Sequence, residues 1–454
     1  IDRNLTVDEA RPYLLPNSEY YLKGPEETAT LFADYPEALT NSEQIAARCR
    51  VALALRNEAL PPTPSDSDES PARQLERLCR EALPRLYPHN RPAAEQQLEH
   101  ELQIINQIAL PGYFLTVWDI VRFAKERRIQ VRGRGSAANS IVAYLLGITN
   151  VDPLAHNLLF ERFLSAESRV MPDIDLDFNA SRREEVIQYV YDKYGEDHVG
   201  MVCNYVTYRQ RSAIRDVGKA LGFPPDLIDH LAKAQGGLGS YHHNDTGHPL
   251  MAEVPNATWE QFLALYEQIQ GLPRHLSIHV GGICVTRRPL VELVPLERAT
   301  MPGRVVIQWN KDSVEDAGLI KLDLLSLGTF GVLDDCLEMI AQRYGRHLDL
   351  DRLPLDDPQL YHTLQIADTV GIFQVESRAQ QQALVKMRPQ EFNDIVIEVA
   401  IIRPGPLLGN MVHPFFRRRM GLEPVTYLHP LLEPILKETL GVIVFQEQVI
   451  RTAM

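Results

Sequence analysis

The sequence lacks any long apolar run and any paired arrangement of cysteines. No stretch approaches the ~20 consecutive apolar residues that a membrane-spanning helix needs, so we expect no membrane partner. The five cysteines are scattered and none stands in CxxC spacing. That pattern argues against a disulfide framework or a zinc ribbon and favours a reducing, cytoplasmic location. No secretory signal is visible, and because the chain begins at Ile1 rather than at Met we expect it to be a fragment of a longer protein.

An excess of positive charge is also missing. The formal net charge is −14, which taken alone speaks against a nucleic-acid partner, because such binding normally rests on Lys and Arg at phosphates. The distribution of charge matters more than its sum. Basic residues gather within Arg122–Arg134, Arg209–Lys219 and Arg417–Arg419. Each cluster is either a solvated helix face or part of a basic groove.

Apolar spacing predicts a mixed α/β fold. Apolar residues recur at helical intervals in four segments, Ala72–Leu83, Ala93–Ile108, Tyr113–Arg127 and Arg182–Tyr194. Strands are predicted over Ile129–Val131, Met171–Phe178, His279–Thr286, Val305–Trp309 and Gly318–Leu325. Helices dominate from Thr329 onward. Two polar stretches, Pro61–Pro71 and Gly236–Thr246, are predicted to be a linker and a loop.

The most informative segment is MPDIDLDF, Met171–Phe178, in which aspartates alternate with apolar residues. Side chains of a strand alternate between its faces, so Asp173, Asp175 and Asp177 are expected to project together. Like charges gathered in a half-buried site repel unless cations lie between them. Carboxylate oxygens suit Mg²⁺ or Mn²⁺, and two such ions can activate a hydroxyl and stabilise a leaving phosphate. A solvated outer strand face is the alternative.

Two further segments gain meaning beside this one. Gly133-Arg134-Gly135-Ser136 stands between a predicted strand and a predicted helix, where glycines and free N–H groups can approach an anion; a plain tight turn explains it equally. Lys321-Leu322-Asp323 places a Lys and an Asp on one face of an apolar strand. Asp323 could complete a carboxylate triad with Asp173 and Asp175. A Gly-Ser turn, an Asp-x-Asp strand and a distant strand Asp occur in this order in nucleotidyltransferases of the polymerase-beta-like superfamily, a likeness of fold-level kind.

The resemblance then becomes specific. GRGSAANS (Gly133–Ser140), MPDIDLDF and KLDLLSLG (Lys321–Gly328) resemble, in order, palm motifs of the bacterial C-family DNA polymerases, the group that includes DNA polymerase III alpha. GIFQVESRAQ (Gly371–Gln380) and AIIRPGP (Ala400–Pro406) are similar to motifs of their fingers. The resemblance implies that Asp173, Asp175 and Asp323 are the catalytic and metal-binding acids, with Asp177 a supporting acid. It also implies nucleotide contacts by Gly135, Ser136, Lys321, Arg403 and Arg162.

Other segments indicate a branch of the family. VESRAQ, HLSIHVGG (His275–Gly282) and MVHPFFRRR (Met411–Arg419) resemble the error-prone, damage-associated branch. The resemblance thus implies an error-prone DNA-directed DNA polymerase of translesion synthesis, which uses dNTPs, primer–template DNA and two Mg²⁺ ions (or Mn²⁺). A sliding clamp and mutasome accessory proteins are expected partners through regions not included in this sequence. A replicative alpha subunit and a non-catalytic DNA-binding scaffold are the alternatives.

The same resemblance implies a domain plan. Residues 1–40 correspond to the end of a polymerase-and-histidinol-phosphatase (PHP) domain, without its metal-binding histidines. Residues 41–204 and 281–327 form the palm, an inserted helical thumb covers 205–280, and mostly helical, truncated fingers cover 328–454.

Overall fold

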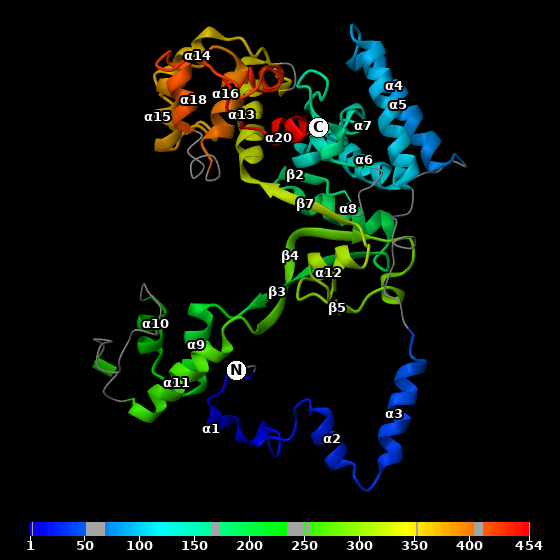
Figure 1. Ribbon diagram of the computed structural model, residues 1–454, viewed down its shortest axis with the longest axis vertical. Helices are drawn as coiled ribbons and strands as arrows, with labels where there is room; N and C mark the ends of the chain where they lie inside the picture. Colours follow the sequence, from blue (N-terminus) through cyan, green and yellow to red (C-terminus); the bar gives the residue numbers. More distant parts are fainter. Residues whose placement is uncertain are drawn as a thin grey trace. The chain divides into compact units, whose positions relative to one another are not determined.

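The computed structural model describes residues 1, 3–50, 69–165, 172–233, 249–250, 254–350, 353–403 and 412–453 (Figure 1). They divide into two units, each assembled from segments that are distant in the sequence. Unit 1 comprises Ile1–Asn57, Gly200–His279 and Leu290–Leu319, and unit 2 comprises Glu58–Val199, Val280–Pro289 and Ile320–Met454. The loop expected over Gly236–Thr246 lies outside the described residues, as does most of Pro61–Pro71.

Strands of unit 2 form a mixed sheet. Strand β1 (Val131–Arg134) runs antiparallel to β2 (Asp175–Asn179), and β2 runs parallel to β7 (Lys321–Leu327). The last part of β4 (Pro273–Val285) pairs antiparallel with β7. With the helices described below, this arrangement confirms the predicted mixed α/β class.

Alternation of side chains explains why β2 and β7 form the centre of this sheet. Leu176 and Phe178 of β2 are fully buried, as are Leu322 and Leu324 of β7, whereas the one residue between Leu176 and Phe178 is the polar Asp177. The neighbouring strand approaches β7 closely at Gly281, where an added Cβ would stand 2.5 Å from the carbonyl oxygen of Leu324. Only glycine therefore fits at this position of β4.

Strand boundaries differ from the prediction at several places. The strand expected over Met171–Phe178 begins only at Asp175, because its pairing with both neighbours begins there. Strand β1 extends through the glycine turn to Arg134, because Gly133 and Arg134 pair with β2. Strand β4 begins six residues earlier than expected, over residues that are exposed or only half-buried. The helix predicted to follow the Gly-Ser turn is split into a 3₁₀ turn, η2 (Gly135–Asn139), and the short helix α7 (Ile141–Leu145).

Four helices of unit 2 form largely where apolar spacing predicts them. They are α4 (Pro71–Leu86), α5 (Arg91–Gln107), α6 (Pro111–Glu126) and α8 (Arg183–Tyr194). Helices α4 and α5 contact each other, and α4 also contacts α6. Helix α6 contacts β1 and α8, and α8 contacts β7. Ten of the sixteen residues of α6 are buried, which makes it the central helix of this region.

Asp119 joins α6 to α8 by a buried hydrogen-bond network. Its carboxylate is 1% exposed and accepts hydrogen bonds from Arg122 (2.7 Å), Lys193 (3.0 Å), Tyr189 (2.8 Å) and Tyr194 (3.0 Å). Burial alone would raise the pKa of Asp119, but the hydrogen bonds from Arg122, Lys193 and Tyr189 outweigh it and hold that pKa below its ordinary value. The group therefore remains ionised at neutral pH.

The C-terminal part of unit 2 is helical, as predicted. After β7 the chain continues directly into α13 (Gly328–Tyr344). Six further described α-helices follow: α14 (Pro358–Gln365), α15 (Arg378–Met387), α16 (Phe392–Ile401), α18 (Val412–Arg419), α19 (Glu433–Leu436) and α20 (Gln446–Ala453). Apolar residues of α15, α16 and α18 share one core cluster, which includes Met387, Ile397 and Phe415.

One buried carboxylate in this helical part has a testable consequence. Glu398 of α16 is fully buried, and neither carboxylate oxygen has a hydrogen-bond partner in the part of the chain that the structure describes. Burial raises the pKa of Glu398 to about 7. The folded protein thus holds this proton more tightly than the unfolded chain does, so stability is greatest below about pH 4 and falls as pH rises toward 7.

We expect Glu398→Gln to remove this loss. At pH 8 the variant should be more stable than the wild type, by up to about 3 kcal/mol, whereas at pH 4 the two should unfold alike. Urea unfolding at both pH values measures the difference. A variant that is less stable than the wild type at pH 8 would show that the carboxylate is needed in its charged form.

Unit 1 holds a second set of strands and a helical group. Strand β3 (Val199–Thr207) pairs parallel with β6 (Val305–Ile307), which pairs antiparallel with β5 (Leu296–Arg298). Helices α9 (Gln210–Ala220), α10 (Pro225–Lys233) and α11 (Asn256–Ile269) bury a common core around Trp259 and Phe262. The other α-helices in the described part of this unit are α1 (Val7–Ala10), α2 (Pro25–Leu31), α3 (Pro36–Arg48) and α12 (Lys311–Asp316).

No single described helix is long and apolar enough to cross a membrane. One bent pair, α5 with α6, meets the length and composition requirement together, with 113° between its helices.

Candidate active site

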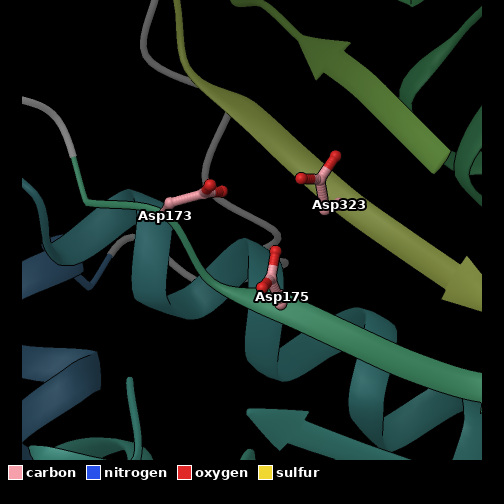
Figure 2. Close-up of side chains that lie close together, drawn as sticks. All are labelled: Asp173, Asp175 and Asp323. Carbon is pink, nitrogen blue, oxygen red and sulfur yellow. The ribbon is translucent and has the colours of Figure 1, made fainter. Parts of the chain in front are cut away.

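Three aspartates from two neighbouring strands converge in unit 2 (Figure 2). Asp175 is the first residue of β2, and Asp173 lies two residues before it. Because β2 and β7 are parallel in a register that pairs Asp175 with Asp323, the two strands place their acids side by side. One carboxylate oxygen from each of the three residues lies within 4.8 Å of the others. Figure 2 shows Asp173 and Asp175 on one segment, facing Asp323 across the gap to the next strand.

The three acids differ in their surroundings. The side chain of Asp173 is 55% exposed, that of Asp175 is 26% exposed and that of Asp323 is 10% exposed. Burial and the neighbouring charge of Asp173 raise the pKa of Asp175 above its ordinary value, against the opposing effect of Arg134. A cation among these oxygens would relieve the repulsion that raises this pKa.

Lys321 places a positive charge beside the three acids. Its ammonium group donates to Asp323 and lies 3.4 Å from Oδ2 of Asp173. Although burial lowers the pKa of Lys321, its hydrogen bond to Asp323 and the charge of Asp173 outweigh that effect and raise it. Lys321 is therefore charged at neutral pH and stands directly against two of the three acids.

Asp177 is not part of the cluster, although alternation along a strand predicts that it projects with Asp173 and Asp175. Nε of Arg134 lies 3.1 Å from Oδ2 of Asp177, and Nη2 of Arg134 lies 3.7 Å from Oδ2 of Asp175. The register of β1 with β2 produces this contact by pairing Arg134 with Asp175. Burial raises the pKa of Asp177, and Arg134 opposes that rise. Arg134 on β1 thus places a positive charge beside Asp175 and Asp177, whereas Lys321 lies on β7, at the other side of β2.

The Gly-Ser turn runs beside Asp175. Gly135 has a φ of +72°, a conformation that favours glycine, and an added Cβ would stand 3.7 Å from Oδ2 of Asp175. Ser136 follows in η2 and is half-buried. The structure therefore places Gly135 next to Asp175, with Ser136 following it in the chain.

Glu101 of α5 fixes the far end of this turn. Its fully buried carboxylate accepts hydrogen bonds from the Ser140 hydroxyl (2.7 Å), from the backbone N–H groups of Ile141 (2.9 Å) and Val142 (3.2 Å) and from Gln97 (3.0 Å). Burial raises the pKa of Glu101 to about 7, against the effect of these hydrogen bonds. No signal in the sequence marks Glu101, because it stands among ordinary helix residues.

The two arginines that the resemblance adds are placed differently. Arg162, in the 3₁₀ turn Phe160–Arg162, forms an ion pair with Glu447 of α20. Its guanidinium is therefore engaged with the C-terminal helices. Arg403 is exposed and follows the end of α16. The Pro404–Pro406 part of its motif lies outside the described residues.

The donor set of the triad fits a divalent cation. Three carboxylates offer hard oxygen ligands of the kind that Mg²⁺ and Mn²⁺ prefer, and their separation permits shared coordination. The cluster can therefore hold a metal ion. Its partly exposed position leaves Asp173 and Asp175 open to a ligand from solvent.

Comparison with known proteins assigns the chain to a class. Residues 73–326 match the family model of the bacterial DNA polymerase III alpha NTPase domain, and residues 329–454 match that of the bacterial DNA polymerase III alpha subunit finger domain. The chain belongs to the bacterial DNA polymerase III alpha family, as its sequence motifs predict.

The names of curated relatives indicate one branch of this family. The chain is 42% identical to an error-prone DNA polymerase of Anaeromyxobacter sp. (strain K), over 99% of this chain and 48% of the relative. It is 44% identical to the error-prone DNA polymerase of Bdellovibrio bacteriovorus, over 98% of this chain and 42% of the relative. For the error-prone DNA polymerase of Mycobacterium tuberculosis the identity is 45%, over 99% of this chain and 40% of the relative. The chain thus spans less than half the length of these relatives.

Proposed function

We propose that this chain is the catalytic core of an error-prone DNA-directed DNA polymerase that acts in translesion synthesis and damage-induced mutagenesis. The observation that carries the proposal is the cluster of Asp173, Asp175 and Asp323, held by the parallel register of β2 and β7. The names of the curated relatives support the error-prone branch over the replicative alpha subunit. The intact triad argues against a non-catalytic scaffold.

The proposed reaction is nucleotidyl transfer at the triad. The primer 3′-hydroxyl attacks the α-phosphate of a template-paired dNTP, the bond between the α-phosphate and the bridging oxygen breaks, and pyrophosphate leaves. Two Mg²⁺ ions (or Mn²⁺) held by Asp173, Asp175 and Asp323 would supply charge stabilisation and activation of the hydroxyl.

Other residues of the chain would bind and orient the nucleotide. Gly135 lies beside Asp175 and Ser136 follows it in η2, and their backbone N–H groups would bind the triphosphate. Lys321 would exchange its contact with the acids for one with the triphosphate. Arg403 and Arg162 remain proposed nucleotide contacts, and for Arg162 this requires release from Glu447.

The domain plan and the partners belong to the same proposal. The palm would comprise residues 41–204 and 281–327, the thumb 205–280, and the fingers 328–454, after a short remnant of the PHP domain over 1–40. Primer–template DNA would be bound mainly through its phosphates, with base pairing supplying the sequence. A sliding clamp and mutasome proteins would bind regions outside this sequence, in the cytoplasm.

Primer extension by the full-length protein tests the proposal. We expect the wild type to extend the primer in the presence of Mg²⁺, with frequent misincorporation on undamaged template. The double variant Asp175→Asn/Asp323→Asn should not extend the primer. A folded wild type that extends no primer would refute the catalytic proposal. Extension with few mismatches would retain the polymerase and favour a replicative role.

A further inference from the structure

Asp173 differs from the other two acids in how its backbone is held. Asp175 pairs with residues of β1 and β7, and Asp323 pairs with residues of β2 and β4. Asp173 lies two residues before the first paired residue of β2 and outside any regular element. Its side chain is the most exposed of the three. Strand pairing therefore does not fix the backbone at Asp173.

The hydroxyl of Tyr113 holds the backbone on both sides of Asp173. It donates a hydrogen bond to the carbonyl oxygen of Pro172 at 3.2 Å and accepts one from the N–H of Ile174 at 3.1 Å. Both flanking residues are buried, so these two backbone groups need a partner within the protein. A single hydroxyl meets both requirements because it can donate one hydrogen bond and accept another.

Tyr113 is itself firmly placed. Its side chain is fully buried in α6, and its ring packs edge-on against that of Phe114, with ring centroids 5.9 Å apart. The hydroxyl therefore ties the residue pair around Asp173 to the central helix of unit 2.

We propose that Tyr113 is a positioning residue that sets where Asp173 presents its carboxylate to the metal ions. The inference rests on the proposed metal centre, and it adds a residue that touches neither metal nor nucleotide. Groups that orient metal ligands typically change metal affinity or activity by about 10–100-fold when they are removed. A purely structural role would instead change stability and leave the dependence on metal unaltered.

Tyr113→Phe in the full-length protein tests this proposal, because it keeps the ring and removes only the hydroxyl. We expect the half-saturating Mg²⁺ concentration for primer extension to rise by about tenfold or more, and Mn²⁺ affinity measured by paramagnetic resonance to fall in parallel. Tyr194→Phe is the matched control: it also removes a buried hydroxyl, one that donates to Asp119. The control should lose comparable thermal stability and keep the wild-type metal dependence.

A double-variant cycle separates action through Asp173 from other effects. In the Asp173→Asn background, adding Tyr113→Phe should cause no further loss of Mn²⁺ affinity. If Tyr113→Phe folds poorly, 4-aminophenylalanine at position 113 is the alternative, because its amino group can donate to Pro172 but accepts only weakly from Ile174. This variant should give an intermediate rise in the half-saturating Mg²⁺ concentration.

The outcomes separate this inference from the proposed function. Wild-type metal dependence in both the Phe and the 4-aminophenylalanine variants, beside an active wild type, would overturn the role of Tyr113 and leave the polymerase proposal intact. A wild type that neither extends primers nor binds Mn²⁺ would overturn both.

Discussion

Asp323→Asn is expected to lower the kcat of DNA synthesis on the order of a thousandfold. Asn has nearly the shape of Asp, so the pairing of β2 with β7 should survive. The substitution removes the negative charge from the most buried of the three acids, which pairs in register with Asp175 and contacts Lys321. Without that charge, a metal ion between the strands loses one of its oxygen anions. Single-turnover incorporation of one dNTP at saturating Mg²⁺ measures the loss.

The matched control for this prediction is Asp177→Asn. Asp177 lies on β2, two residues beyond Asp175, but its contact is Arg134 and it lies outside the three-acid cluster. We therefore expect Asp177→Asn to slow incorporation less than about tenfold, because it removes an ion pair with Arg134 near the three-acid cluster and not one of the three acids. Equal losses for the two variants would contradict the assignment of Asp323 as a metal ligand.

The second large effect concerns stability. Asp119→Ala is expected to lower the free energy of opening of α8 by about 3 kcal/mol, because it leaves Lys193 and Arg122 without their shared buried partner and two tyrosine hydroxyls without an acceptor. Amide hydrogen exchange in α8 should then accelerate roughly a hundredfold. The effect should be present above about pH 4 and shrink as pH falls through the lowered pKa of Asp119.

Asp192→Ala provides the comparison on the same helix. Asp192 is exposed and accepts a hydrogen bond from Gln188 four residues earlier, an interaction worth only a few tenths of a kcal/mol. Exchange in α8 should therefore stay close to that of the wild type. If both variants exchange alike, the network around Asp119 does not hold α8 to α6.

Local sequence patterns predicted the elements of the site well. Apolar spacing marks α6 and α8, and the alternation in MPDIDLDF marks β2, because both signals come from residues adjacent in sequence. The convergence of Asp173 and Asp175 with Asp323 could be anticipated only from the order of motifs in a known family. Its physical cause, a parallel register between strands almost 150 residues apart, leaves no local trace.

Residues that act through tertiary contacts could not be predicted. Tyr113 has the pattern of an ordinary apolar helix position, and nothing nearby in the sequence indicates that its hydroxyl meets the backbone beside Asp173. Alternation also placed Asp177 with the other acids, whereas Arg134 on the adjacent strand draws it into a separate pair. The ion pair of Arg162 with Glu447 joins segments 285 residues apart and is equally invisible in the sequence.

The most direct test of the proposed metal centre is the number and magnetic coupling of Mn²⁺ ions bound by the full-length protein with primer–template DNA and a non-hydrolysable dNTP analogue. Electron paramagnetic resonance should show two bound ions with the magnetic coupling expected for a separation of about 3.5–4 Å, and Asp323→Asn should abolish that coupling. Saturable binding of uncoupled ions only, or a coupled pair that Asp323→Asn leaves unchanged, would contradict the assignment of Asp173, Asp175 and Asp323 as a two-metal centre.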